Sequence, residues 1–419
     1  MTAATRTESA RNFAFVGHTD QGGRSDGTQI MVSDGYAYVA HPFSHGFSVI
    51  DVRDPRAPRP VNFVPCRPGT WTLALQVSGD ILTVTEEFDF FGLTDEQGAH
   101  FAASTASGGG GIDSRHEIYR GRNEWFTSGL RVYDISDRAN PRPIGFCEIP
   151  GFGLHRSWWT GGRYLYASAS LDGFSDHVLV SIDMSDPTAP TLAGRFWIPG
   201  MWLAGGEEPT WTGRVALHHA LVSGDLAASA WRDGGMALLD LADPARPELV
   251  SRLSWHPPYG GNTHTTLPLP DRGLVVVADE AGAEVGTEEQ KRTWLVDVRA
   301  PHNPVPIATL PMPADQDYHA KGGVFGPHNL WENRPGAFVS SDLVFATYQS
   351  AGVRAFDISD QYQPREAGYF VPSPPERMVD PRPGIPPVLH SSDLFVAADG
   401  LTYVIDYNAG LHILQWQGE

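Results

Sequence analysis

The stretch Phe356-Asp357-Ile358-Ser359-Asp360-Gln361-Tyr362-Gln363-Pro364 leads from an apolar segment through an aspartate to a proline. Related segments recur along the chain as VIDVRDPRAP at 49–58, VYDISDRANP at 132–141, SIDMSDPTAP at 181–190, LLDLADPARP at 238–247 and LVDVRAPHNP at 295–304. An aspartate side chain can accept hydrogen bonds from the backbone of a turn, and a proline then fixes the exit of the chain. We therefore interpret the repeated aspartates as structural residues.

The repeat has a period of about 55 residues and consists of strand-like segments, which is typical of one propeller blade per repeat. Second strands of the blades are predicted at 36–40, 81–85, 164–168, 226–230, 274–278, 343–347 and 401–405. The segment 13–17 resembles the strand that follows each turn, and 394–416 supplies three strands of a last blade. The predicted fold is therefore all-β, a seven-bladed β-propeller closed by the N-terminal strand, which completes the last blade.

The segments outside this repeat define the predicted domain organisation. Residues 1–11 are predicted to be a disordered leader, and residues 12–419 are predicted to form one propeller domain. A long insertion at 87–128 contains four consecutive glycines at 108–111. We expect it to lie over one end of the channel as a lid, and a plain surface loop is the alternative.

The composition of the 419-residue chain excludes some partners. The 30 Lys and Arg residues stand against 49 Asp and Glu, for a formal net charge of −19, and no basic run is present. Neither nucleic acid nor an anionic membrane is therefore an expected partner. The N-terminus lacks the apolar segment of a signal peptide, and two cysteines do not make a disulfide framework, so a cytoplasmic location is predicted.

Histidines stand where the first strands of five predicted blades begin. The candidate metal ligands are His155, His219, His264, His328 and His390. His218 precedes His219, and strand alternation lets only one of the two face the axis; alignment with the first blade favours His219. Neutral imidazoles with carboxylates suit Fe, Mn, Zn or Cu, so we predict one divalent transition metal on the axis, with Fe preferred.

Further candidates stand at the ends of second strands and in one long loop. The candidate catalytic residues are Glu86, Asp279, Asp406, Tyr348 and His319. The carboxylates could orient the histidine ligands or move protons, and Glu87 and Glu280 follow directly in the sequence. Aromatic residues near the same face favour a small organic substrate.

The segments FSVID, LRVYD, MALLD and TWLVD resemble the repeats of the LVIVD-repeat β-propeller family, over about residues 12–416. The histidines at the blade starts are more distantly similar to those of carotenoid-cleavage oxygenases, which hold Fe(II) with four histidines, and of selenium-binding proteins. This second resemblance implies His219, His264, His328 and His390 as ligands, with His155 as a fifth candidate.

These residues lead to one expected function and two alternatives. The first expectation is a metal-dependent enzyme of the non-haem oxygenase type that acts on a small organic substrate. A metal-dependent lyase, isomerase or hydrolase could use the same ligands. A non-catalytic propeller that presents one face to protein partners is the alternative from another class.

Overall fold

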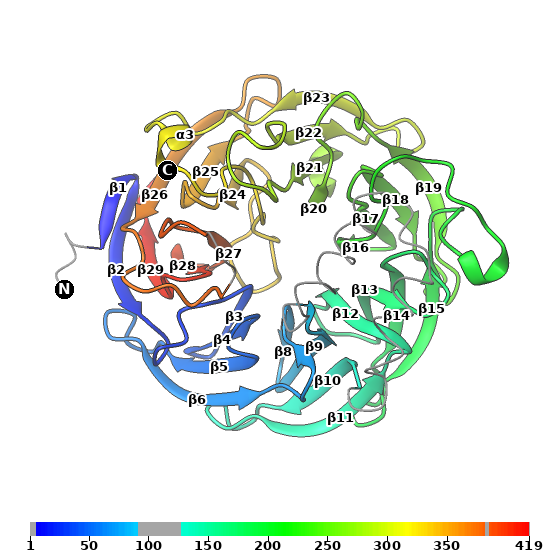
Figure 1. Cartoon of the computed structure of the whole chain (residues 1–419), viewed down its shortest axis with the longest axis horizontal. Coiled ribbons are helices and arrows are strands. Elements are labelled where there is room, and N and C mark those ends of the chain that lie inside the picture. Colours follow the sequence, from blue (N-terminus) through cyan, green and yellow to red (C-terminus); the bar gives the residue numbers. More distant parts are fainter. Residues whose placement is uncertain (1–5, 91–126, 382–384, 419) are drawn as a thin grey trace.

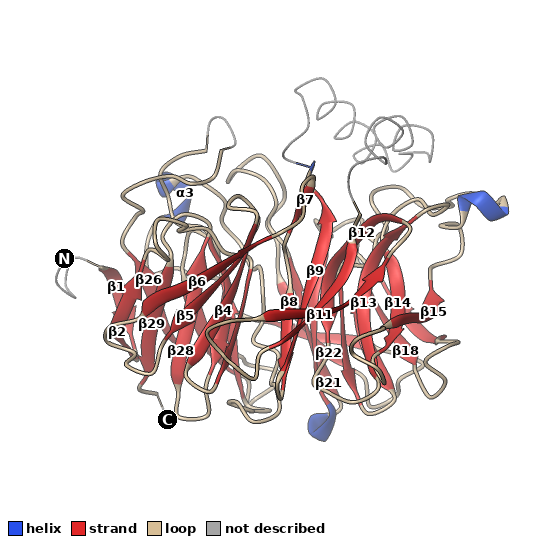
Figure 2. Cartoon of the chain, turned by 90° about the horizontal axis from the view of Figure 1, so that it is seen from below, coloured by secondary structure: helices blue, strands red, loops and turns tan. Residues whose placement is uncertain are grey.

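The computed structural model describes residues 6–90, 127–381 and 385–418. Antiparallel sheets are arranged in a ring around a common axis, with the strands of each sheet following one another from the axis outward (Figure 1). Seen from the side, the strands run roughly along this axis and the loops gather at its two ends (Figure 2). No described helix is long and apolar enough to cross a membrane.

Five sheets have four strands each, all antiparallel. The first is β3 (Gln29–Ser33), β4 (Tyr36–His41), β5 (Gly46–Asp51) and β6 (Arg59–Pro65). Two more are β16 (His219–Ser223), β17 (Leu226–Ala230), β18 (Met236–Asp240) and β19 (Glu248–Leu253), and β20 (Thr263–Leu269), β21 (Leu274–Asp279), β22 (Thr293–Asp297) and β23 (Val305–Thr309). The last two are β24 (Leu343–Thr347), β25 (Val353–Asp357), β26 (Arg365–Pro372) and β1 (Thr7–Arg11), and β27 (Ser391–Val396), β28 (Leu401–Asp406), β29 (Leu411–Trp416) and β2 (Phe13–Thr19).

The remaining strands form one nine-stranded sheet. Its members are β7 (Thr70–Trp71), β8 (Leu75–Ser78), β9 (Ile81–Phe88), β10 (Gly129–Asp134), β11 (Arg142–Glu148), β12 (Gly151–Trp158), β13 (Tyr164–Leu171), β14 (Val178–Asp183) and β15 (Thr191–Phe196). The two halves are joined because β9 pairs with β10 along its length and with β12 through Gly153 and Glu87. The structure is thus an all-β propeller-like ring, and it does not divide into seven separate sheets.

Short helical turns connect some of the strands. They are η3 (Leu203–Gly205), η4 (Pro270–Arg272) and α3 (Tyr318–Lys321). The segment around His328 was predicted to be a first strand, but it forms only an isolated bridge between Leu330 and Ala346. Its backbone still follows β24, because the His328 N–H donates to the Thr347 carbonyl at 3.0 Å.

The two N-terminal strands tie the start of the chain to its end. The predicted pairing of the N-terminal strand with the last sheet is confirmed, with β2 running antiparallel to β29 from Phe13 opposite Trp416 to Thr19 opposite Leu411. The predicted disordered leader is wrong for Thr7–Arg11, which form β1 on the edge of β26. That edge would otherwise leave backbone groups unpaired. The predicted lid at 87–128 lies mostly outside the described residues.

Glycines in the outer strands let neighbouring sheets approach closely. A Cβ atom on Gly145 of β11 would lie 2.2 Å from the Pro187 carbonyl oxygen, and one on Gly194 of β15 would lie 2.5 Å from the Pro244 carbonyl oxygen. Both prolines belong to the aspartate turn of the following repeat. A side chain at these positions would therefore push adjacent repeats apart.

The repeated aspartates are structural, as predicted. In each turn one carboxylate oxygen accepts a hydrogen bond from the N–H two residues later, at 2.8 to 3.2 Å; the aspartates are Asp51, Asp134, Asp183, Asp240, Asp297 and Asp357. All but Asp240 also pair with an arginine. Hydrogen bonds from the hydroxyl and N–H of Ser359, and then from Arg365, lower the pKa of Asp357.

We predict that Asp357→Ala lowers the free energy of unfolding at pH 7 by about 1 kcal/mol, the net worth of a typical hydrogen bond. Asp357→Asn should retain most of the stability because its side-chain oxygen can still accept from Ser359. The folded pKa lies below the unfolded one, so the carboxylate contributes fully above the unfolded pKa, and this contribution is lost as the pH falls through the folded pKa. Urea unfolding at pH 7 and pH 3 checks this. Equal stability of Asp357→Ala and wild type at pH 7 would contradict a structural role.

Candidate functional site

Four histidines meet at a cavity of about 140 Å³ near the axis of the ring. Their side chains come from four different repeats: His155 from β12, His218 from the residue before β16, His264 from β20 and His328 from the segment beside β24. The cavity is also lined by Glu280, Arg232 and Arg156, and by apolar or aromatic side chains of Pro42, Phe43, Trp71, Leu73 and Tyr407. Polar groups in an otherwise apolar pocket are typical of a ligand site.

The four imidazole rings are held through Nδ1. Nδ1 of His155 lies 2.9 Å from Glu87 Oε2, that of His218 lies 2.8 Å from the His264 carbonyl oxygen, and that of His328 lies 2.5 Å from the Ser392 carbonyl oxygen. Carbonyl and carboxylate oxygens only accept, so in these three rings Nδ1 carries the proton and the lone pair is on Nε2. Nδ1 of His264 lies 2.9 Å from the Thr265 hydroxyl. Histidine ligands of metals are usually fixed in this way.

Burial keeps the imidazoles neutral. It lowers the pKa of His155 and His328, and it lowers the pKa of His218 and His264 well below 6.5, with a further contribution from neighbouring positive groups. The rings of His218 and His264 are stacked, with centroids 3.5 Å apart and an interplanar angle of 27°. A protonated ring here would place a charge against its neighbour, so the stacked pair is stable only when neutral. Neutral imidazole is the form that binds metals.

Glu280 supplies a carboxylate beside two of these rings. Its oxygens lie 3.6 Å from His264 Nε2 and 3.5 Å from His328 Nε2, and Arg232 donates to it. Burial raises the pKa of Glu280, but Arg232 and His328 outweigh this and the net pKa is lowered, so the group is ionised. The ligand atoms of His264, Glu280 and His328 all lie within 4.8 Å of one another. This is a suitable donor set for a divalent cation.

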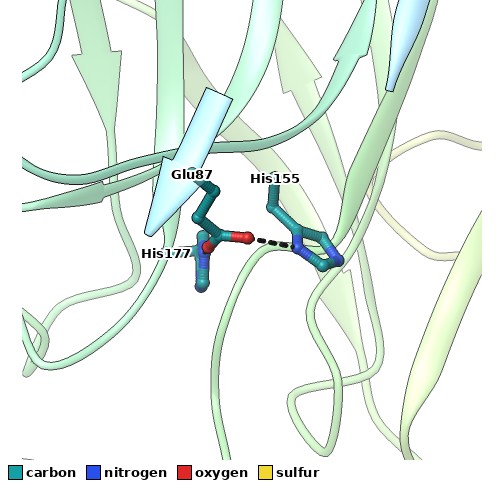
Figure 3. Close-up of side chains that lie close together, drawn as sticks. All are labelled: Glu87, His155 and His177. Carbon is teal, nitrogen blue, oxygen red and sulfur yellow. Dashed lines mark hydrogen bonds and ion pairs between the residues drawn. The ribbon is translucent and has the colours of Figure 1, made fainter. Parts of the chain in front are cut away.

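A second cluster supports His155 from behind. Glu87 accepts from His155 Nδ1 at 2.9 Å and faces His177 Nε2 at 2.6 Å, and Figure 3 shows its carboxylate between the two rings. The other nitrogen of His177 faces Asp176 at 2.7 Å. Burial lowers the pKa of His177, but Glu87 and Asp176 outweigh it and raise the pKa. His177 thus donates from both nitrogens and has no lone pair for a metal, although Glu87, His155 and His177 together have the composition of a metal site.

Two of the predicted histidines lie elsewhere. The choice of His219 over His218 is wrong: neighbouring strand residues face opposite sides, and the structure turns His219 away from the cavity toward Glu332, whose Oε1 lies 3.7 Å from its Nε2. His390 stacks on Tyr407 with centroids 4.2 Å apart and lines a neighbouring cavity. His155, His264 and His328 do meet, as predicted.

Two of the predicted catalytic carboxylates, Glu86 and Asp279, come one residue before the carboxylates that face the site. Glu86 pairs with Arg67 and Arg131, each at 3.1 Å. Asp279 accepts from the indole N–H groups of Trp255 and Trp294, and burial raises its pKa to about 7. Because side chains alternate along a strand, it is the following residues, Glu87 and Glu280, that face the histidines.

The other three predicted catalytic residues do not line the cavity of the four imidazoles. Asp406 accepts backbone N–H groups of Asn408, Ala409 and His390 at 2.8 to 3.0 Å, so it shapes a turn. Tyr348 is fully buried against Phe325 and Phe356. His319 lies exposed on α3.

Several residues of the site were not among the predicted metal ligands or catalytic residues. Arg156 follows His155 directly, and both line the cavity because β12 departs from regular pairing between Leu154 and Ser157. A local bulge of this kind has no signal in the alternation pattern. Arg232 and His177 lie on connections whose path depends on the ring as a whole. For Glu87 and Glu280, a stricter use of strand alternation would have sufficed.

Comparisons with known proteins agree with this architecture. Residues 25–62 and 160–197 match the family model of the LVIVD repeat. No curated protein matches the sequence. Similar solved structures include the periplasmic gluconolactonase PpgL of Pseudomonas aeruginosa, with 12% identity, 98% of each chain covered and a TM-score of 0.51. Others are the WD40 β-propeller domain of Doa1, with 9% identity, 98% and 96% covered and a TM-score of 0.51, and the β-propeller domain of Cps50 (Swd1) from Myceliophteria thermophila, with 10% identity, 97% and 98% covered and a TM-score of 0.52.

At these identities the structural likeness concerns the fold alone, and it defines the class of this protein as a β-propeller. The matched segments add that this β-propeller chain contains LVIVD repeats, as its strand-to-aspartate segments predicted.

We predict that Glu87→Gln lowers the free energy of unfolding by about 3 kcal/mol, because it removes the charge that compensates buried His177. Glu87 is 1% exposed and its carboxylate also accepts from the Trp71 indole at 3.1 Å, so the amide would meet donors it cannot satisfy. Urea unfolding measures the loss. The exposed Glu148→Gln is the control and should change stability by less than about 0.5 kcal/mol. A similar, small effect of both substitutions would mean that the cluster carries no charge.

Proposed function

We propose that this protein is a metal-dependent enzyme of the non-haem oxygenase type that binds one divalent transition metal at the axial cavity. The ligands are the Nε2 atoms of His264 and His328 and the carboxylate of Glu280. The convergence of these three groups carries the proposal. Two histidines with one carboxylate are the ligand set of non-haem iron(II) oxygenases. His155 and His218 offer two further imidazoles at the same cavity.

An iron(II) ion would supply activation of dioxygen and polarisation of a bound substrate. The residues of the chain prepare the site for it. The carbonyl of Ser392 fixes the ring of His328, and Arg232 holds Glu280 as a carboxylate. Trp71 and Leu73 line the cavity with apolar surface, which leaves less room for water beside a small organic substrate.

The same ligands would also serve a metal-dependent hydrolase, lyase or isomerase, in which the metal stabilises an oxyanion or enolate. The bound element separates the two classes, since zinc is redox-inert. A non-catalytic scaffold would need no metal at all.

The proposal also includes two features of the whole protein. We count the nine-stranded sheet as two adjoining blades, β8 to β11 and β12 to β15, which with the other five sheets makes seven. The many hydrogen bonds between β9 and β10, against a single residue pair between β9 and β12, support this division. We propose a cytoplasmic location, in keeping with the free thiols of Cys66 and Cys147.

Elemental analysis by plasma mass spectrometry tests the metal. Protein without a histidine tag, purified without chelator and incubated anaerobically with iron(II), should hold about one iron per chain after desalting. His264→Ala and His328→Ala should each lose most of the metal, because each removes one of three ligands. His319→Ala is the matched control and should keep it, since that side chain lies exposed on α3.

The outcomes discriminate between the candidate functions. Iron that also binds nitric oxide, detected by electron paramagnetic resonance, would support an open position for dioxygen. If the protein as isolated is fully occupied by zinc and takes up no iron, the hydrolase or lyase class would be favoured. Wild-type protein that takes up none of Fe, Mn, Zn and Cu, or ligand variants that retain full occupancy, would overturn the metal site.

A further inference from the structure

Four arginines of the described chain are buried: Arg156, Arg232, Arg334 and Arg354. Arg156 differs from the other three. Arg232 pairs with Glu280, Arg334 with Glu332, and Arg354 with Asp315 and Glu366. Arg156 is 4% exposed, and no carboxylate of the described residues forms an ion pair with it. A buried charge without a partner is strongly destabilising, so a reason for its presence is required.

The guanidinium of Arg156 is only partly satisfied. Its Nη2 donates to the Asn329 side-chain oxygen at 2.6 Å, whereas its buried Nη1 has no hydrogen-bond partner among the described residues. The charge of Arg156 acts on the Asp393 carboxyl group from beyond ion-pair distance. Burial nevertheless raises the pKa of Asp393 to about 7, and Asp393 Oδ2 accepts from the Ile30 N–H. Asp393 is therefore not a fixed counter-ion.

Arg156 lines the same cavity as the four imidazoles. The bulge in β12 brings it there beside His155, and the Ser168 hydroxyl accepts from its backbone N–H at 2.9 Å, which secures that conformation. The remaining wall near it is largely apolar or aromatic. The cavity thus combines one unpaired cation with apolar surface, and its volume is that of about four or five water molecules.

From these observations we propose that the substrate of the axial site is a small organic acid whose carboxylate is bound by Arg156. The planar guanidinium matches a carboxylate through parallel hydrogen bonds, and Nη1 supplies a donor that no group in the described part of the chain uses. That this acid is a substrate rests on the proposed function, whereas the anion site rests on Arg156 alone. Arg156 would be a specificity-determining residue that holds the acid beside the proposed metal ligands.

Binding of matched acid and amide pairs tests this inference. Isobutyrate and isobutyramide have the same shape and differ in charge, and isothermal titration would compare them on metal-depleted protein and on protein incubated with iron(II). We expect isobutyrate to bind metal-depleted wild type at least tenfold more tightly than the amide. Arg156→Gln should remove this preference, and Arg156→Lys should keep part of it because it retains the charge without the planar fork.

Controls keep the two proposals separable. Arg156→Gln removes an uncompensated buried charge, so its thermal unfolding temperature should not fall, and loss of binding would then not reflect unfolding. Acid preference in protein that binds no metal would support the anion site while the metal proposal fails. Isobutyrate binding that needs metal and is unchanged in Arg156→Gln would overturn the inference, as would chloride binding as tightly as isobutyrate.

Discussion

The pairing of β2 with β29 joins the two ends of the chain in one sheet, and the position of every first strand depends on it. This sheet places β27 beside β3, where the Ile30 N–H donates to Asp393. Residues as far apart in sequence as His155 and His328 can then face one axis. Contacts of such large sequence separation have a high entropic cost, which the many residue pairs of the closing sheet offset. The site is therefore a property of the ring rather than of any one repeat.

Within that ring, burial and neighbouring charges together set the protonation of the groups that line the central cavity. Burial favours neutral imidazoles, and the oxygen atoms behind His155, His218 and His328 decide which nitrogen keeps its proton. Glu280 remains charged mainly because Arg232 accompanies it. The result is a set of fixed lone pairs beside one carboxylate, which would need little further reorganisation to bind the proposed cation.

The fold could be predicted well because its signals repeat. The second strands begin at the predicted residues, since they are short, mainly apolar segments and six of the seven are followed by the aspartate turn one strand later. His155, His264 and His328 could be found because they recur at similar places ahead of the second strands of their repeats. His219, Glu86 and Asp279 were chosen over their neighbours, and a shift of one residue along a strand moves a side chain to the other face. Arg156 depends on a bulge and His177 on a contact with Glu87 from another repeat, and neither has a local signal.

The charges of the cavity connect the proposed metal with the proposed acid. With neutral imidazoles, the groups lining the cavity are Glu280, Arg232 and Arg156, which leave one positive charge in excess. A divalent cation would add to this excess, and like charges in a water-poor site repel each other strongly. An organic acid on Arg156 would reduce the repulsion, so each of the two ligands would bind more tightly in the presence of the other, by the same factor. The unpaired arginine would thus cost stability in the protein without ligands, and it would couple binding at the proposed metal site to binding of the proposed acid.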